Sequence, residues 1–186
     1  IHSTGINNGS PEDPEDPSDP GTDEPTLPEG ILGEVDGSNA AVHVDGIHMT
    51  EEDHEANKVG TSYNFTNVTG DIYGFYMDEA QSKMKVGETY KMAFYMTLNG
   101  YSEGMEGRKI KLRPFEEYYY NPTNEELYNT EVGGTQKVIV SVVFKYTGAR
   151  IEGYLWDEGG MDGTIDKIAV AAADYDFGTP DDDYYL

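Results

Sequence analysis

Apolar and polar residues alternate along two long segments of the chain, 90–98 and 137–146. A period of two places successive side chains on opposite faces of a β-strand, so each segment is predicted to be a strand with one face in a hydrophobic core. The opposite face of the first strand, which carries Tyr95, is predicted to be accessible. That of the second strand is apolar in its middle, at Ile139 and Val143. The predicted core positions are Tyr90, Met92, Phe94, Met96, Leu98, Val138, Val140, Val142, Phe144 and Tyr146.

Shorter apolar or aromatic runs, separated by Gly, Asn and Asp clusters, follow Gly30 and are typical of strands and turns. Helical patterning is limited to single turns at 50–55 and 78–83, too short to organise a fold. The number and spacing of the strands predict an all-β fold, a two-sheet antiparallel β-sandwich, over residues 31–177. Besides the two long strands, we expect strands at 41–44, 62–68, 72–77, 108–115, 127–131, 150–156 and 164–172.

Both ends of the chain lack this pattern. Proline alternates with carboxylates between Ser10 and Gly30, and the last residues are acidic. Such a composition buries too little apolar surface to offset the entropy of ordering, and dense proline with like charges favours an extended spacer. We therefore expect a disordered linker at 1–30 and an acidic tail at 178–186. A spacer predicts a larger multidomain or surface-anchored protein; the alternative is a frayed terminus without a tethering role.

The charge balance restricts the possible partners. The formal net charge is -24, from 36 acidic and 12 basic residues, so nucleic acid and anionic lipid surfaces are repelled. The sequence has no cysteine, which excludes disulfides and thiolate metal sites, and no apolar run of membrane-spanning length. It also has no histidine pair at the spacing of a zinc motif, no phosphate loop and no dinucleotide fingerprint. Neutral or cationic partners remain.

Aromatic residues are abundant, with 15 tyrosines, 6 phenylalanines and one tryptophan, more than the core of such a domain needs. Strand alternation places Tyr154 and Trp156 on one face with Leu155 opposite. Two flat rings on one face form a platform on which a sugar ring can stack while its hydroxyls form hydrogen bonds at the edges. The alternative is that Trp156 belongs to the core. Tyr95 is predicted to extend the platform, together with Tyr73 or Tyr76, depending on which face of their strand packs inward. At least one of Tyr118, Tyr119 and Tyr120 is predicted to form a loop wall beside it; the alternative for each of these three is local packing of the loop.

Carboxylates are too numerous to identify a catalytic pair. Glu152, Asp157 and Glu158 flank the aromatic platform, but nothing in the sequence distinguishes them from solvated charges, and we predict no catalytic residues. Calcium is a more specific hypothesis. Asp157, Asp162 and Asp166 lie among glycines, which allow backbone carbonyls to turn toward a hard cation. The alternative for these three aspartates is a solvated acidic loop.

Three segments carry a resemblance to a known family. They are 86–96 (Val-Gly-Glu-Thr-Tyr-Lys-Met-Ala-Phe-Tyr-Met), the long strand 136–146, and 163–170 (Gly-Thr-Ile-Asp-Lys-Ile-Ala-Val). Together they resemble the jelly-roll carbohydrate-binding modules, of the xylan- and glucan-binding kind, that are attached to bacterial glycoside hydrolases. The resemblance implies a jelly-roll form of the β-sandwich.

The same resemblance implies two kinds of site. Aromatic residues on the concave sheet of these modules bind glycan chains, which points to Tyr95, Tyr154 and Trp156 in this chain. A structural calcium commonly lies near their first and last strands, which points to Asp166. The chain departs from the family pattern at Lys167, which stands where a second acidic residue is usual.

We therefore predict a noncatalytic module, secreted or at the cell surface, that binds a neutral polysaccharide by aromatic stacking. Two alternatives come from other classes. One is a structural surface or filament subunit that assembles through the apolar positions Ile139 and Val143. The other is a small glycosidase, which the absence of a catalytic signature disfavours.

Overall fold

The computed structural model describes residues 26–42, 50–65, 71–99, 110–115, 118, 120, 126, 135–157 and 162–180, without the side chains of 42, 71–73, 110, 156 and 157. Most of the expected linker, the strand predicted at 127–131 and most of the expected tail lie outside these residues. Among the described helices, none is long and apolar enough to cross a membrane.

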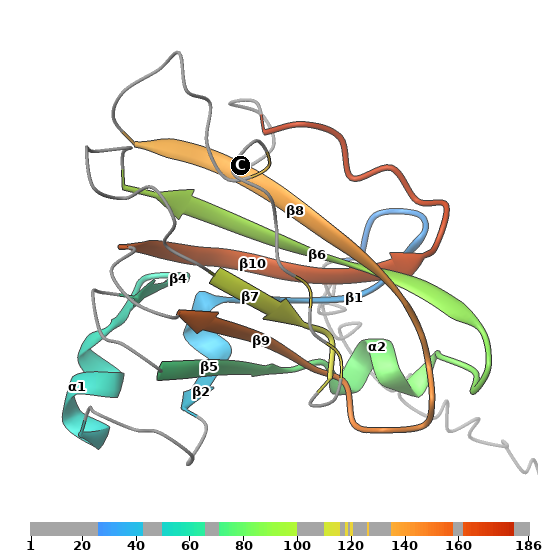
Figure 1. The fold of residues 1–186 in the computed structure, drawn as a ribbon, viewed down its shortest axis with the longest axis horizontal. Helices are drawn as coiled ribbons and strands as arrows, with labels where there is room; N and C mark the ends of the chain where they lie inside the picture. The colour runs from blue at the N-terminus through green and yellow to red at the C-terminus, as the bar shows by residue number, and fades with distance from the viewer. Residues whose placement is uncertain are drawn as a thin grey trace, which may run out of the picture.

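Two antiparallel sheets, A and B, form a β-sandwich, which confirms the predicted fold (Figure 1). Sheet A has the order β3-β4-β10-β6-β8, with β1 also paired to β10, and sheet B has the order β2-β5-β9-β7. The strands of sheet A are β1 (Ile31–Asp36), β3 (Lys58–Val59), β4 (Ser62–Phe65), β6 (Thr89–Leu98), β8 (Gln136–Lys145) and β10 (Gly163–Ala172). Those of sheet B are β2 (Ala40–Val42), β5 (Asp71–Tyr76), β7 (Ile110–Arg113) and β9 (Glu152–Asp157).

Three long strands form the centre of sheet A. β6 pairs with β8 on one side and with β10 on the other, so that Phe94 lies opposite both Val140 and Ile168. β10 in turn pairs with β4 through 163–165 and with β1 through 167–171, on either side of a register shift. The alternation seen in the sequence therefore runs in register across neighbouring strands, and their apolar faces coincide.

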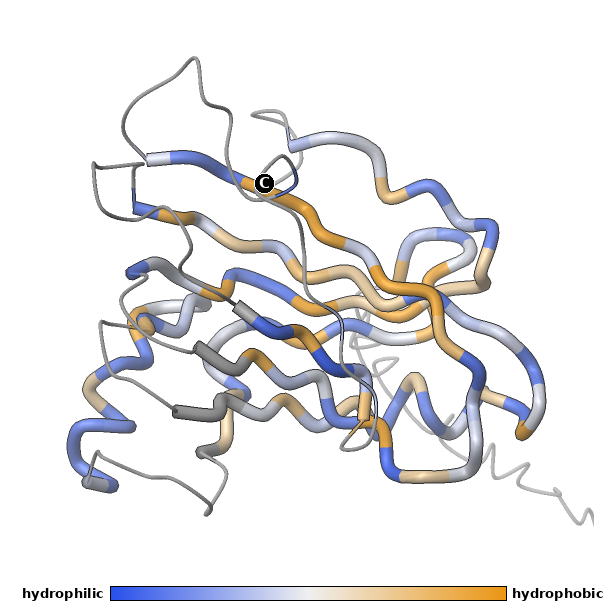
Figure 2. Tube along the Cα trace, viewed as in Figure 1, coloured by the Kyte–Doolittle hydropathy of each residue, from blue (hydrophilic) through white to orange (hydrophobic). Residues whose placement is uncertain are grey.

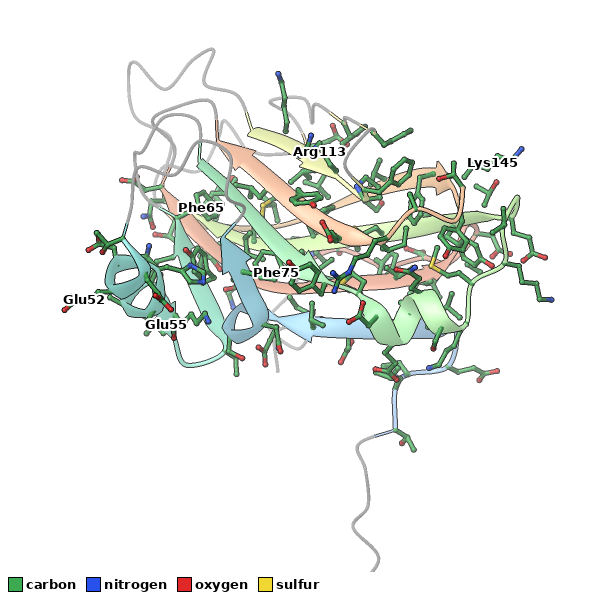
Figure 3. The ribbon with its side chains drawn as sticks, turned by 90° about the horizontal axis from the view of Figure 1, so that it is seen from below. Glu52, Glu55, Phe65, Phe75, Arg113 and Lys145 are labelled. Carbon is green, nitrogen blue, oxygen red and sulfur yellow. The ribbon has the colours of Figure 1, made fainter. Side chains whose placement is uncertain are left out.

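The hydrophobic core lies between the two sheets. Every core position predicted in 90–98 and 137–146 is buried. Sheet B contributes Phe75, Leu112 and Leu155, each with no exposed surface. Hydrophobic residues recur along the long strands of sheet A in Figure 2, and Figure 3 shows Phe65 and Phe75 between the layers. Burial of this apolar surface is the main stabilising contribution to the fold.

Short helical segments connect the strands, as the sequence predicts. α1 (Glu51–Ala56) begins with a capping box between Thr50 and Asp53, and α2 (Asp78–Ser82) follows β5 directly. A 3-10 turn, η1 (Gly37–Asn39), joins β1 to β2. A Cβ on Gly37 would lie 2.2 Å from the backbone nitrogen of Tyr63, so only glycine allows this close approach of η1 to β4.

The outward face of sheet A is covered by the C-terminal end of the domain. Residues 173–178, here called the C-terminal strap, follow β10 and turn back toward β8 (Figure 1). The Phe177 ring packs edge-on against Tyr95, and Lys91 Nζ donates a hydrogen bond of 2.6 Å to the carbonyl of Tyr175. Tyr95 is consequently only 3% exposed. The prediction that this face of β6 is accessible at Tyr95 is therefore wrong.

Candidate functional site

Sheet B has a face that points away from sheet A, here called the outer face of sheet B. Phe75, Leu112 and Leu155 belong to the core, and a Cβ at Gly153 would lie 3.0 Å from Ile168 Cδ1 of sheet A. Because side chains alternate along a strand, the neighbours of these residues point outward. The described residues that alternate with them are Gly74, Tyr76, Lys111, Arg113, Glu152 and Tyr154.

The centre of this face is an arginine stacked on a tyrosine. Arg113 of β7 lies directly opposite Tyr154 of β9, and its guanidinium carbon is 4.8 Å from the centre of the Tyr154 ring. On the other side, Gly74 of β5 lies opposite Tyr154, and a Cβ there would be 3.2 Å from Tyr154 Cε1. The missing side chain of Gly74 thus leaves room for the ring, in a cation–π pair with Arg113.

Both members of this pair are buried: Tyr154 is 1% and Arg113 is 5% exposed. The prediction that Tyr154 faces opposite to Leu155 is confirmed, since Leu155 is in the core. The expectation that the Tyr154 ring is an open stacking surface is wrong, because almost none of the side chain is accessible.

An exposed aromatic ring lies farther along the same face. Tyr76, at the end of β5, is 41% exposed, the most exposed aromatic residue among the described large hydrophobic ones. The guanidinium of Arg150 stacks 3.9 Å from its ring centre. Arg150 is held from both sides, with Asp78 Oδ1 at 3.6 Å and Glu152 Oε1 at 3.5 Å. The guanidinium therefore covers one face of the Tyr76 ring, and the remainder of the side chain stays exposed.

Arg150 also lines a pocket of about 550 Å³, a volume in the range usual for small-molecule sites. Gln81 Oε1 accepts a hydrogen bond from the Ile151 amide at 2.8 Å, and Ser82 Oγ donates one of 2.6 Å to the Glu79 carbonyl. The amide group of Gln81 and the lone pairs of Ser82 keep further hydrogen-bonding capacity. The pocket is lined by Asp78, Gln81, Ser82, Tyr146, Gly148 and Arg150.

Sequence reasoning identified Tyr76 but not the groups around it. Arg150 is far from Tyr76 in the sequence, and it reaches the ring because β5 and β9 are neighbours in which Tyr76 lies opposite Glu152. Gln81 is positioned by α2, where its side chain holds the backbone of Ile151.

The remaining predicted aromatic residues lie outside the described side chains. The backbone of Trp156 is part of β9, opposite Ile72 and Lys111, and that of Tyr73 is part of β5, opposite Leu155. Tyr119 is outside the described residues. The shared platform of Tyr154 and Trp156, and the roles of Tyr73 and Tyr119, therefore stay predictions.

Two tyrosines of the predicted loop wall pack against the core. Tyr118 and Tyr120 are partly buried, and the Tyr118 hydroxyl donates a hydrogen bond of 3.1 Å to the Val143 carbonyl. The Tyr120 hydroxyl donates to Glu126 Oε1 at 2.5 Å. Burial, together with this carboxylate, raises the pKa of Tyr120 to about 12. Both residues therefore have local packing roles.

The predicted calcium ligands do not gather into one site among the described side chains. Asp166 lies in sheet A, and its carboxylate accepts hydrogen bonds from the hydroxyls of Ser62 and Thr164 at 2.8 Å and of Thr97 at 2.7 Å. The described residues contain no group of three His, Cys, Asp or Glu side chains able to hold a metal ion. Asp162 precedes β10, and the side chain of Asp157 is not among those described. The carboxylate of Asp166 links three strands of sheet A, and calcium binding by these aspartates stays a prediction.

No protein-family model and no curated protein matches the chain. Among solved structures, it is similar to the apo form of BiXyn10A CBM1, with a TM-score of 0.41 and 11% identity over 77% of this chain and 99% of that one. It is also similar to the CBM22-1 xylan-binding domain of Xyn10C from Paenibacillus barcinonensis, with a TM-score of 0.36 and 10% identity over 80% and 91%. A third similarity is to a family 16 carbohydrate-binding module, with a TM-score of 0.27 and 14% identity over 63% and 78%. These values describe a partial likeness between β-sandwiches and do not extend to individual side chains.

Proposed function

We propose that this chain is a noncatalytic module that binds a polysaccharide on the outer face of sheet B, around Tyr76. The observation that carries the proposal is the 41% exposed Tyr76 ring, whose stacking partner Arg150 also lines a pocket with polar side chains. Exposed tyrosine presents a flat apolar surface to the C–H face of a sugar ring. The adjoining amide, hydroxyl and guanidinium groups suit sugar hydroxyls, which both donate and accept hydrogen bonds.

The arrangement favours binding over catalysis. The described carboxylates nearest to Tyr76, Asp78 and Glu152, are both oriented toward the Arg150 guanidinium. A glycosidase instead needs two carboxylates that flank the scissile bond of the sugar. We propose further that residues 1–30 tether the module to a larger secreted or surface-anchored protein, as their Pro-, Asp- and Glu-rich composition suggests.

Affinity electrophoresis in gels containing xylan, glucan or mannan tests this proposal. At least one of these polysaccharides is expected to retard the wild-type protein. Tyr76→Ala should weaken this binding about two- to twelvefold, because an aromatic stacking contact is worth about 0.5–1.5 kcal/mol. The matched control is Val143→Ala, a truncation of a 47% exposed residue on sheet A, which should bind like the wild type. Absence of retardation on all the gels would contradict the proposal.

One observation favours the alternative of a structural subunit. Val143 is exposed on the outward face of β8. Ile139, on the same face, is partly buried because it packs against the cluster that includes Tyr95 and Phe177. An exposed apolar residue on an edge strand is a usual point of assembly. Size-exclusion chromatography at increasing concentration separates the two functions: a subunit should assemble and Val143→Ala should prevent it, whereas a glycan-binding module should stay monomeric.

A further inference from the structure

The pocket that Arg150 lines contains two polar side chains whose hydrogen-bonding direction is fixed. They are Gln81 and Ser82, neighbours at the end of α2. α2 is held in place because Ala80, the residue before them, has no exposed surface and belongs to the core. Both side chains therefore line the pocket from a fixed piece of backbone.

The Ile151 amide determines which end of the Gln81 side chain stays available. A backbone N–H can only donate, so the atom that it meets at 2.8 Å is the carbonyl oxygen Oε1. Ile151 has no exposed surface, so this bond is made to a fixed part of the core. Nε2 carries two N–H donors, and among the described residues none accepts a hydrogen bond from it. Gln81 therefore keeps only donors for a ligand.

Ser82 has the opposite hydrogen-bonding character. Its hydroxyl donates its proton to the Glu79 carbonyl at 2.6 Å, so the exposed Oγ can only accept a bond from a ligand. Asp78 adds a second acceptor group, with 72% of its side chain exposed. The Arg150 guanidinium is already engaged by two carboxylates and a stacked ring, which leaves Gln81 as the available donor.

A donor next to an acceptor matches two adjacent hydroxyl groups of a sugar ring. One hydroxyl oxygen accepts a hydrogen bond from the amide, and the neighbouring hydroxyl donates its proton to the serine or carboxylate oxygen. In a 1,4-linked polysaccharide each interior unit has such a pair, the free hydroxyls at C2 and C3. In a 1,3-linked hexose polymer the free hydroxyls at C2 and C4 are separated by the linkage carbon, so the interior units have no adjacent pair.

We propose that Gln81 and Ser82 select neutral 1,4-linked polysaccharides whose units keep two adjacent free hydroxyls, with the Gln81 amide as the specificity-determining donor. This selectivity rests on the proposed glycan-binding function and narrows its ligand class. Stacking at Tyr76 supplies affinity for any sugar ring, whereas the pocket distinguishes the units that carry the hydroxyl pair. An acetyl ester or a glycosidic bond on either hydroxyl removes the pair.

The test uses matched polysaccharides in affinity electrophoresis. Xylan, 1,4-linked glucan and mannan are each used as the free polymer and after O-acetylation, which keeps the polymer neutral, and a linear 1,3-linked glucan is the linkage control. Gln81→Glu keeps an oxygen for the Ile151 amide but replaces the donor by an acceptor. Ser82→Ala removes the acceptor. Gln136→Glu makes the same chemical change at the first residue of β8, whereas Tyr146 of the pocket follows the last.

We expect the wild type to bind at least one free 1,4-linked polymer more strongly than its acetylated form and more strongly than the 1,3-linked glucan. Gln81→Glu and Ser82→Ala should each weaken binding to the free polymer about two- to twelvefold, as the loss of one hydrogen bond does, and should reduce its advantage over the acetylated form. Gln136→Glu should bind like the wild type. Tyr76→Ala should weaken binding to both forms equally, because both keep the faces of their sugar rings.

Equal wild-type binding to the free and acetylated forms would overturn recognition of the hydroxyl pair while leaving glycan binding in place. Unchanged binding by Gln81→Glu would overturn the role of the amide. Thermal melting shows whether this variant is folded; if it melts well below the wild type, unchanged binding by Ser82→Ala, at an exposed position, would overturn the proposal instead. Retardation of the wild type by no polymer would overturn the glycan-binding function itself.

Discussion

The Tyr95 ring of β6 meets the Phe177 ring of the C-terminal strap edge-on, with centroids 6.3 Å apart and an interplanar angle of 84°. Tyr175 contacts Phe177 in turn, at 4.7 Å. Below the rings lie Ala93 and Ala169, which face each other across β6 and β10 and leave space for the strap. The molecule thus has a second, smaller hydrophobic cluster on the outside of sheet A, completed by residues that follow the last strand.

The strap is expected to contribute to the stability of the whole domain. Phe177→Ala should lower the free energy of unfolding by about 3 kcal/mol, because it removes a buried aromatic ring and leaves a cavity over Tyr95. Urea denaturation measures the change. Asp174→Ala, at an exposed position in the same strap, is the control and should have little effect. Equal destabilisation by the two variants would show that the ring contact is not what matters.

Stability should also depend on the protonation of His54. His54 Nδ1 lies 2.8 Å from the Tyr63 hydroxyl and Nε2 lies 3.2 Å from the Ala40 carbonyl, so α1 is joined to both sheets. Burial lowers the pKa of His54, and the nearby Lys58 adds to this effect, whereas Glu51 and Glu55 oppose it. The unfolded chain therefore binds a proton more readily than the folded protein.

It follows that stability falls as the pH decreases from about 6.5, the ordinary pKa of histidine, toward the lower value in the folded state. Thermal melting of the wild type and of His54→Gln between pH 8 and pH 5 tests this expectation. The variant should lose less stability over this range, while carboxylate titration affects both proteins alike. Parallel curves for the two proteins would rule out His54 as the titrating group.

Asp166 should stabilise the fold without calcium. Its carboxylate accepts hydrogen bonds from Ser62 of β4, Thr97 of β6 and Thr164 of β10, which joins three strands of sheet A. Asp166→Ala should cost about 1–3 kcal/mol, because the partly buried hydroxyls lose their acceptor. The melting temperature of the wild type should not change with a chelator or with added calcium. A calcium-dependent increase that is absent in Asp166→Ala would support the calcium-site hypothesis instead.

The strands that the sequence predicts best are those with regular alternation. β6 and β8 follow the pattern of 90–98 and 137–146 closely, because each has one face in the core and one face outside it. β1 was missed, since its sequence Ile-Leu-Gly-Glu-Val-Asp does not alternate and its register with β10 shifts near Gly33. A Cβ at Gly33 would lie 2.7 Å from the backbone of Ala80, so this position reflects the packing of α2 rather than strand preference.

Strand alternation also predicted part of the candidate site. Alternation correctly separates Tyr154 from Leu155, and it leaves open whether Tyr73 or Tyr76 points outward. The structure places Tyr76 outward and exposed, because Phe75 beside it is in the core. It also identifies Arg113 and Arg150 as the cations stacked on Tyr154 and Tyr76. These contacts join segments that are far apart in the sequence, so no local pattern predicts them.

The sequence by itself determined the all-β class, the two long core strands and the acidic character of the chain, because period-two burial and composition are properties of local sequence. Only the tertiary structure decided which aromatic rings are accessible. Tyr95 and Tyr76 each lie on the outward face of a strand, yet the strap covers the first, whereas the second is exposed on the other sheet. Exposure depends on what packs against a face from elsewhere in the chain, and strand alternation carries no information about that partner.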